Sequence, residues 1–536
     1  MQSNQHSLHW ADQLAEKIIE RAHREKRVPN VKCQQTPSGG KHIGNLNDVM
    51  RAYFPYKSVV EKGEKCTFVH TIDDRDPLKD IPAKFADLDA KWHDSSQFAE
   101  LKKYLGRPLV RVPDPFGCCS SYAAHFTTVW MAGLKMIGVE PELHSVDTLY
   151  KAGKFDPYIK LVFENREKAG KIVSDLQTTK DATYVPFDAI CPQCGVLSNI
   201  DDFDLKGRKV HFVCGGKAIK KKKAEGCGYE GWIAWGEGKL QWRFEWPALM
   251  CIFNTTFEPF GKDHAEGSWK SVLRIMPEIF KREPPIPFMY EFFLVNGEKM
   301  SASKGNVYIV QDMLKIMEPE PFKFYYVKRP EKQRDLDLSK VFQLVDEFDE
   351  SEKAYFGKGE EKSENREENA KRMYDLAMSE IPKKCPNRVS FSFAAQLAQL
   401  LTVDKAVKTL KELGHISTSG DVALAKRRLA VAKVWIELYG KEHRLNVSTV
   451  AEANQHKSLL SSNQQGALSD FATALASAMN ESAQMEQIRN ICKKHNLPVS
   501  DFFSAVYSTL INKPRGPKLH TLVSVLGREK VASLLA

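Results

Sequence analysis

Short apolar runs alternate with helical patterns in the first part of the chain, and this alternation restricts the fold more than any other feature. One such run is 67–72, Thr-Phe-Val-His-Thr-Ile, and one helical pattern covers 122–136. This alternation is typical of βαβ units, whose strands become parallel neighbours. Residues 31–150 therefore predict half of a parallel α/β sheet. Strand patterns return at 287–295, where we expect the second half.

The length and charge of the chain exclude several classes of protein. Its 536 residues are enough for roughly three or four domains. We find no basic segment followed by an apolar run at the start, and no apolar stretch of roughly eighteen residues. We therefore expect a cytoplasmic protein without a signal peptide or a membrane partner. The net charge of +10 fits an RNA partner, but it equally fits a charge that only maintains solubility.

A glycine-rich segment indicates a phosphate site. Residues 36–45 read Thr-Pro-Ser-Gly-Gly-Lys-His-Ile-Gly-Asn and precede a helix-like stretch. Glycine lets the backbone approach a phosphate, and the N–H groups at the start of a helix attract anions. His42 and Asn45 can donate hydrogen bonds to phosphate or ribose oxygens. An ordinary tight turn is the alternative interpretation of this segment.

A second segment, 299–306, reads Lys-Met-Ser-Ala-Ser-Lys-Gly-Asn. Two lysines flank two serines on what we expect to be a mobile loop, which would offer cations and hydroxyl donors to a triphosphate. A basic surface loop is the alternative for any one lysine-rich segment. The presence of both segments in this order makes coincidence a poor explanation.

The His-Ile-Gly-Asn and Lys-Met-Ser-Ala-Ser-Lys sequences resemble the two signature motifs of class I aminoacyl-tRNA synthetases. The resemblance implies a Rossmann-type catalytic domain that binds ATP, with Mg²⁺, between the motifs. It implies that His42 and Asn45 contact phosphates in the transition state. Lys299 and Lys304 would stabilise charge on the β- and γ-phosphates. The ATP-binding residues that the resemblance implies are Ser38, Gly39, Gly44, Gly261, Asp263, Met300, Ser301 and Ser303.

Further segments resemble class I lysyl-tRNA synthetases in particular. These segments are 73–76, 112–118, 242–247, 261–264, 289–293 and 502–507. The resemblance implies that the substrates are ATP, L-lysine and tRNA-Lys. It places four residues around the lysine, namely Thr36, Trp246, His264 and Tyr290. A lysine pocket needs an acid or an aromatic face for the ammonium group. Trp246 and Tyr290 can pack on the four-carbon stem or face the cation, and Asp73, Asp74 and Glu245 are the candidate counter-charges.

The chain departs from this family pattern at three positions. Gln34 stands where a glycine is usual, Lys41 where an apolar residue is usual, and Arg75 where a tyrosine is usual. Simple core packing is the alternative role for Trp246 and for Tyr290.

Two other functions stay open on the sequence alone. One is a class I synthetase for another amino acid, such as glutamate or arginine. The other is a catalytically silent RNA-binding paralogue, against which the intact His42, Lys299 and Lys304 argue.

A cysteine cluster predicts an inserted, zinc-ribbon-like module. The expected ligands are Cys191, Cys194, Cys214 and Cys227. Four thiolates around Zn²⁺ leave no open position, so the metal would be structural. Redox chemistry at Cys-x-x-Cys is the alternative, and His211 is the expected substitute ligand. The same module holds a basic run at 206–224, which is either a solvated face or a contact for the tRNA acceptor stem.

The pattern after residue 360 is helical throughout, which predicts a C-terminal all-α domain. The resemblance implies that this domain binds the anticodon. We therefore expect five regions: the first half of the catalytic domain at 1–150, the insertion with the zinc ribbon at 151–250, the second half at 251–310, a stem-contact region and linker at 311–360, and the helical domain at 361–536.

Overall fold

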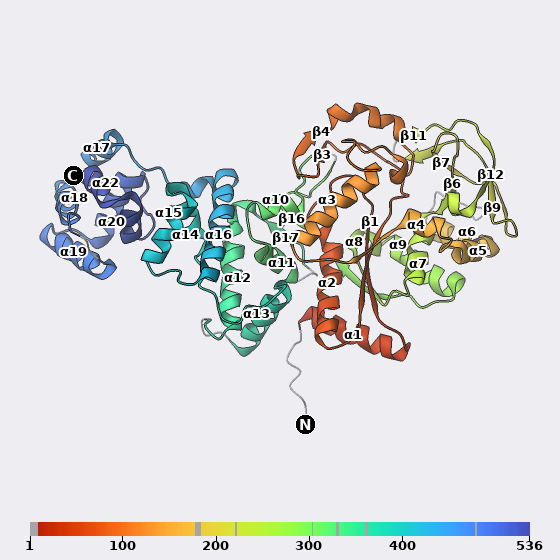
Figure 1. The fold of residues 1–536 in the computed structure, drawn as a ribbon, viewed down its shortest axis with the longest axis horizontal. Helices are drawn as coiled ribbons and strands as arrows, with labels where there is room; N and C mark the ends of the chain where they lie inside the picture. Colours follow the sequence, from red (N-terminus) through yellow and green to blue (C-terminus); the bar gives the residue numbers. More distant parts are fainter. Residues whose placement is uncertain are drawn as a thin grey trace, which may run out of the picture. The chain divides into compact units, whose positions relative to one another are not determined.

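The chain folds into two units (Figure 1). The structure is a computed structural model, and it describes residues 9–176, 184–219, 222–302, 304–328, 332–359, 363–477 and 480–536. The first unit comprises Met1–Leu314, Pro319–Asp337 and Gly357–Ile381. The second comprises Lys315–Glu318, Leu338–Phe356 and Pro382–Ala536. Within the described ranges, no helix has both the length and the apolar character needed to span a bilayer.

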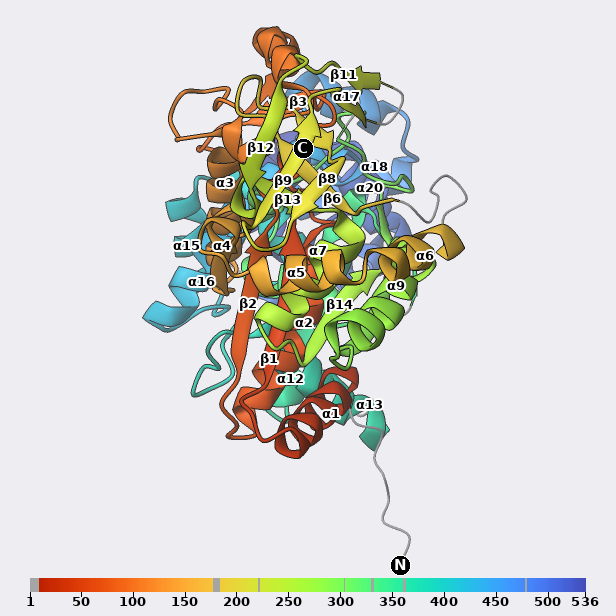
Figure 2. The ribbon, with the colours of Figure 1, turned by 90° about the vertical axis from the view of Figure 1, so that its right-hand side faces the viewer.

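A five-stranded parallel sheet is the centre of the first unit, as the alternating pattern predicted. Its strands, in spatial order, are β15 (Ile286–Tyr290), β14 (Phe257–Gly261), β1 (Asn30–Gln35), β2 (Thr67–Ile72) and β5 (Glu142–Ser145). Strands β1, β2 and β14 run side by side in Figure 2. The chain leaves β1 toward β2 on one side and returns much later as β14 on the other. In such Rossmann-type sheets, ligands bind at the carboxyl end of the strand where the order reverses.

Helix α2 (Leu46–Glu61) begins directly after the glycine-rich segment. Its apolar face, which includes Val49, Met50 and Phe54, is fully buried, and the helix packs on β1 and β14. The amino end of α2 therefore lies at the carboxyl edge of the sheet, where its unpaired N–H groups can attract an anion.

The other helices of the first unit surround the sheet or extend its edges. They are α1 (Trp10–Arg24), α3 (Tyr122–Met136), α4 (Val146–Lys151), α5 (Asp156–Glu164), α6 (Arg166–Leu176), α7 (Trp242–Ile252), α8 (Lys262–Ala265), α9 (Ser268–Ile275), α10 (Val310–Leu314), α11 (Pro319–Val327) and α13 (Glu364–Ala377). The first unit also contains two pairs of short strands. In one, β3 (Lys84–Ala86) pairs with β4 (Trp92–Asp94), and in the other, β16 (Phe293–Val295) pairs with β17 (Arg334–Leu336).

The insertion, which the sequence predicted as a zinc-ribbon-like module, is made of short antiparallel strands. They are β6 (Phe187–Ile190), β7 (Leu197–Asn199), β8 (Asp202–Asp204), β9 (Lys209–Val213), β10 (Lys217–Ile219), β11 (Lys222–Ala224), β12 (Glu230–Ala234) and β13 (Gly238–Leu240). They form the sheets β13-β6-β7, β12-β9-β8 and β10-β11. In Figure 2 these strands, in yellow and yellow-green, are separate from the parallel sheet. Buried Phe187, Phe212 and Trp235 join the insertion to one apolar core with α7 and α9.

The second unit is helical, in agreement with the predicted all-α domain. Its helices are α12 (Val341–Tyr355), α14 (Phe391–Leu400), α15 (Val403–Glu412), α16 (Ser419–Leu438), α17 (Val450–Ser458), α18 (Ser462–Ala474), α19 (Glu481–Lys494), α20 (Val499–Ile511), α21 (Leu519–Leu526) and α22 (Arg528–Leu535). The last six share a core that contains Phe471, Phe502 and Leu510.

The structure divides the chain differently from the expected start of the helical domain at 361. Helix α13 belongs to the first unit, because Tyr374 and Leu376 are fully buried there and the helix packs on α11 and α2. Arg372 also forms an ion pair of 2.6 Å with Asp12 of α1. The charged stretch 357–372 thus starts a segment that returns to the first unit.

Candidate functional site

Residues of both motifs line one cavity of about 420 Å³. The lining residues from the motifs are Thr36, Ser38 and Lys41 from the first, and Ser301 and Ala302 from the second. The segment that follows β2 contributes the opposite wall, from Asp76 to Pro82. The cavity therefore opens at the carboxyl ends of β1 and β2, where the strand order predicts a ligand.

Main-chain hydrogen bonds join the first motif to Tyr308, two residues after the second motif, and join the second motif to Ala83, next to the cavity wall. The N–H of Ile43 donates to the carbonyl of Tyr308 at 2.8 Å. The N–H of Ala83 donates to the carbonyl of Ala302 at 3.1 Å. A methyl group at Gly44 would come within 3.1 Å of the Met300 side chain. The two segments are distant in sequence and adjacent in space.

Gly39 has a geometric reason to be glycine. Its φ is +139°, and a Cβ atom there would lie 2.8 Å from the Pro82 ring. The backbone of the first motif can therefore approach the opposite wall closely. Asn45 is the residue before α2, and its side chain makes no capping hydrogen bond to the helix.

The imidazole of His42 is neutral near pH 7. Burial and the nearby ammonium groups of Lys41 and Lys299 lower its pKa to about 4. Its Nδ1 accepts a hydrogen bond of 3.1 Å from the N–H of Gly44. The proton is therefore on Nε2, which leaves one donor for an anion in the site.

The second motif is arranged by a turn. The N–H of Ser301 donates to Oδ1 of Asn306 at 2.9 Å, and the N–H of Lys304 donates to the carbonyl of Ser301 at 3.1 Å. The Lys299 ammonium lies 4.0 Å from the centre of the Phe292 ring. The predicted ATP-binding residue Ser303 lies outside the described residues.

A second group of predicted residues meets at the ends of β14 and β15. A Cβ atom at Gly261 would lie 2.8 Å from Oδ1 of Asp263 and 3.6 Å from the Tyr290 hydroxyl. The Tyr290 hydroxyl donates a hydrogen bond to Asp48 on the first turn of α2. Burial, with Asp263 and Glu258 nearby, raises the pKa of Asp48 to about 7. The sequence analysis missed Asp48, although its position three residues after Asn45 placed it at the same helix end.

Trp246 and His264 belong to an aromatic cluster. Their rings are 5.4 Å apart, and Trp242 stacks on Trp246 with centroids 5.3 Å apart. The Trp246 indole N–H donates to Glu258 at 2.7 Å, and the fully buried Lys32 lies 2.7 Å from the same oxygen. Trp246 is only 2% exposed, so it is packed as a core residue and fixed in orientation at the same time.

The three acids suggested as counter-charges have different surroundings. Asp73 and Glu245 are fully buried and lie 3.2 and 2.9 Å from the ammonium of Lys239 on β13. Asp74 instead accepts hydrogen bonds at the start of α4, from the Ser145 hydroxyl and the N–H of Asp147. Its carboxylate therefore stabilises a helix end, and we leave Asp74 out of the lysine pocket.

Several buried polar atoms at the carboxyl ends of β1 and β2, and one near the amino end of β14, have no hydrogen-bond partner among the described residues. They are Gln34 Nε2, Gln35 Nε2 and Oε1, Thr71 Oγ1, Asp73 Oδ2 and Glu258 Oε2. Such atoms are rare in folded proteins, and a cluster of them marks a place where a polar ligand supplies the missing partners.

Comparison with known proteins gives one consistent result. A family model described as tRNA synthetases class I (K) matches residues 8–380. A protein named "Lysine--tRNA ligase" from Natronomonas pharaonis is 35% identical over 98% of this chain and 96% of its own length. A protein of the same name from Haloarcula marismortui is 36% identical over 97% of this chain and 96% of its own length. Another from Pyrococcus furiosus is 33% identical over 98% of this chain and 99% of its own length.

The chain belongs to the class I (K) family of tRNA synthetases. In this family member, the four cysteines of the insertion converge, with all sulfurs within 4.8 Å of one another. The sulfurs of Cys191 and Cys227 are 3.6 Å apart, and those of Cys194 and Cys214 are 3.5 Å apart. Zn–S bonds of about 2.3 Å in a tetrahedron place sulfurs about 3.8 Å apart, so the cluster fits Zn²⁺. His211 is not part of it and pairs with Asp201 at 2.6 Å.

A second group that could hold a metal ion was missed in the sequence. It consists of Asp114, Cys118, Cys119 and His125. Nδ1 of His125 lies 3.3 Å from Cys118 Sγ and 3.2 Å from Asp114 Oδ1, while Nε2 lies 2.9 Å from the carbonyl of Ala86. A carbonyl that accepts the Nε2 proton of His125 leaves Nδ1 as the metal-binding nitrogen. The signal was the spacing of Asp, Cys, Cys and His around a Pro-Phe-Gly turn.

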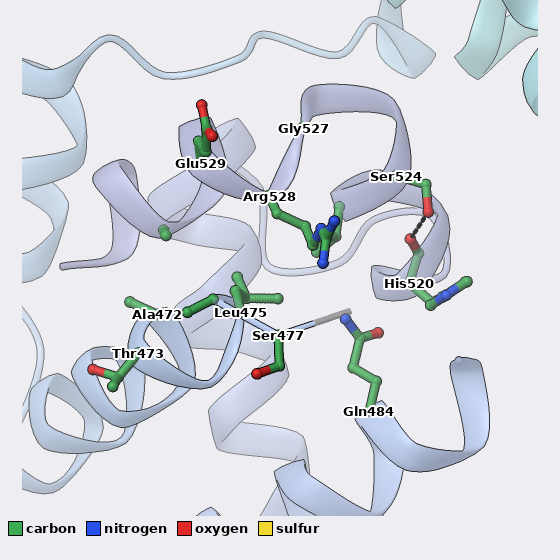
Figure 3. Close-up of a pocket in the computed structure, with 13 residues that line it drawn as sticks. Ala472, Thr473, Leu475, Ser477, Gln484, His520, Ser524, Gly527, Arg528 and Glu529 are labelled. Carbon is green, nitrogen blue, oxygen red and sulfur yellow. Dashed lines mark hydrogen bonds between the residues drawn. The ribbon is translucent and has the colours of Figure 1, made fainter. Parts of the chain in front are cut away.

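The helical unit of the synthetase also contains a cavity, of about 850 Å³, between α18, α19, α21 and α22 (Figure 3). Gln484, His520 and Arg528 are among its lining residues, together with Ser477 and Ser524. Gln484 is only 4% exposed, so most of its polar side chain is inside the protein. The cavity combines hydrogen-bond donors and acceptors in one place.

Proposed function

We propose that the chain is a lysine–tRNA ligase, which activates L-lysine with ATP and transfers it to the terminal adenosine of tRNA-Lys. The observation that carries this proposal is the cavity lined by both motifs at the carboxyl end of β1. The names of the relatives at 33–36% identity support lysine over glutamate or arginine as the amino acid.

In the first step, the carboxylate of lysine attacks the α-phosphorus of ATP, and pyrophosphate leaves. Positioning and charge neutralisation dominate such phosphoryl-type transfers. His42 donates its Nε2 proton to a phosphate oxygen, since its Nδ1 is already an acceptor. Asn45 supplies a second donor at the start of α2. Asp263 accepts hydrogen bonds from the ribose hydroxyls.

The loop of the second motif neutralises the leaving pyrophosphate. Lys299 and Lys304 carry the positive charge for this role, and Mg²⁺ arrives with ATP. In the second step, a hydroxyl of the terminal adenosine attacks the carbonyl carbon of the lysyl-adenylate and AMP leaves. Thr36 lines the cavity at the point where the first motif begins, close to the reacting carboxylate.

For the ammonium group of the substrate, we propose Asp48 as the counter-charge, with Tyr290 beside it. Asp48 has no cationic partner within ion-pair distance among the residues described, whereas Asp73 and Glu245 already surround Lys239. Trp246 and His264 would line the four-carbon stem. The polar atoms of Gln35 and Glu258 that lack partners would form hydrogen bonds with the α-amino group of the substrate lysine.

Zn²⁺ is proposed at both metal-ligand groups, where it would tie loops together and supply no reaction chemistry. The four-cysteine group leaves no open position for a substrate.

The helical unit would hold the anticodon loop of the tRNA, with one unstacked base in the cavity lined by Gln484 and Arg528. Lys209 and Lys217, from the basic run in the insertion, would contact the backbone of the acceptor stem.

Pyrophosphate exchange tests the proposed amino-acid specificity. With tRNA present, we expect ATP–pyrophosphate exchange with lysine and none above background with glutamate or arginine. Exchange with glutamate or arginine, and not with lysine, would show that the chain is a class I synthetase for that amino acid. No exchange with any amino acid would favour the silent RNA-binding paralogue.

A further inference from the structure

Lys41 is a cation that the family pattern does not contain. It stands in the first motif where an apolar residue is usual, and it lines the cavity with Ser38 and Ser301. Its ammonium donates a hydrogen bond of 3.4 Å to the Ser38 hydroxyl. Its side chain therefore borders the space that the proposed function gives to ATP.

The two lysines that line this cavity differ in their partners. Lys79 forms an ion pair of 2.7 Å with Asp76. Lys41 has no carboxylate within 4.0 Å among the residues that the structure describes. A cation at the wall of a cavity without a counter-ion is expected to attract an anion.

A second observation connects Lys41 with the catalytic histidine. The charges of Lys41 and Lys299 both act on the imidazole of His42 and lower its pKa. Lys41 belongs to the first motif and Lys299 to the second, and of these three residues Lys41 lines the cavity. A polyphosphate between the motifs would be attracted by both ammonium groups.

We propose that Lys41 binds a phosphate group of ATP and is a third cationic contact beside Lys299 and Lys304. This inference rests on the proposed function, since it assumes that the cavity receives ATP. It adds a residue to the reaction that the family pattern does not predict.

Lys41 also makes ATP binding sensitive to pH. Burial and the nearby Lys79 lower its pKa, and Asp48, Asp73 and Asp76 raise it, with a net value of about 8. The ammonium is charged below this pH and loses its proton above it. In the free enzyme, kcat/KM for ATP should therefore fall as the pH rises above 8.

Three variants test the proposal in the lysine-dependent pyrophosphate exchange of the full-length protein with tRNA. We expect Lys41→Met to lower kcat/KM for ATP by roughly ten- to hundredfold, the size of effect for one charged contact. Lys41→Arg should keep most of the activity and lose the decline above pH 8, because arginine stays charged. Lys79→Met removes the same charge from the same cavity and should cost less than about threefold, since exposed ion pairs contribute little.

The outcomes separate this inference from the proposed function. Equal losses in Lys41→Met and Lys79→Met, at unchanged thermal unfolding midpoints, would overturn a specific contact by Lys41. Wild-type values of kcat/KM for ATP in Lys41→Met would overturn it as well. Either result leaves the lysine activity of the wild-type protein intact, whereas a wild-type protein without exchange would overturn the proposed function itself.

Discussion

The ammonium of Lys239 lies 2.9 Å from a carboxylate oxygen of Asp76, and this contact joins the insertion to the wall of the cavity lined by the two motifs. Lys239 is on β13 of the insertion, and Asp76 follows β2 of the parallel sheet. Asp73 and Glu245 lie within 3.2 Å of the same ammonium, so three carboxylates share one fully enclosed cation. The insertion and the cavity are therefore linked electrostatically.

Replacing Lys239 by methionine should destabilise the first unit. Removal of the cation leaves the buried carboxylates of Asp73 and Glu245 without a counter-charge, while Asp76 keeps its ion pair with Lys79. Breaking a buried pair costs about 3–5 kcal/mol. The check is the free energy of unfolding in urea. Lys151→Met is the matched control, since Lys151 pairs with Asp147 at 2.7 Å but is 60% exposed and should cost less than about 1 kcal/mol. Equal effects of the two variants would contradict the assigned role of Lys239.

The affinity for lysine should depend on the ionisation of Asp48. Burial holds the pKa of its carboxyl near 7, so Asp48 is charged above this pH and neutral below it. The KM for lysine should rise below pH 7, by roughly tenfold for each pH unit. Steady-state kinetics across this range provide the measurement.

Two variants isolate this dependence. Asp48→Asn should have a high KM for lysine at every pH, without the change near 7. Tyr290→Phe removes a hydrogen bond that lowers the pKa of Asp48, so the change should move to higher pH. A KM that varies with pH in Asp48→Asn as it does in the wild type would exclude Asp48 as the counter-charge.

Metal analysis should find two zinc ions per chain, one for each of the two ligand groups. Cys191→Ser and His125→Ala should each remove one of them, because each replaces one ligand of a different group. Chelation should lower the thermal unfolding midpoint of the wild type. If the wild type held one zinc ion per chain, and Cys191→Ser but not His125→Ala removed it, the metal would be bound in the insertion alone.

Lys304→Ala should slow adenylate formation by about hundredfold or more, since a single charged contact to a transition state contributes about 2.7–4 kcal/mol. Single-turnover formation of lysyl-adenylate measures this directly. Lys103→Ala changes an exposed lysine on a 3₁₀ helix outside both motifs and serves as the control. A rate for Lys304→Ala equal to that of the control would remove Lys304 from the reaction.

The periodicity of the sequence predicted the parallel sheet because strands and helices differ in their apolar spacing. The motifs identified Ser38 and Ser301 as ATP-binding residues only through family resemblance, since nothing local brings 36–45 and 299–306 together, and Lys41 was expected only as a departure from the family pattern. The roles of Asp74 and Lys239 could not be predicted, because they depend on strands that are distant in sequence. The group around His125 was missed because its ligands surround a turn instead of forming a Cys-x-x-Cys pair.

Aminoacylation of total tRNA with each of the twenty amino acids in turn tests whether the two motifs close on ATP to activate lysine for tRNA. We predict that lysine alone is attached, and that its attachment requires ATP. Attachment of a different amino acid, or of none, would refute the proposed function.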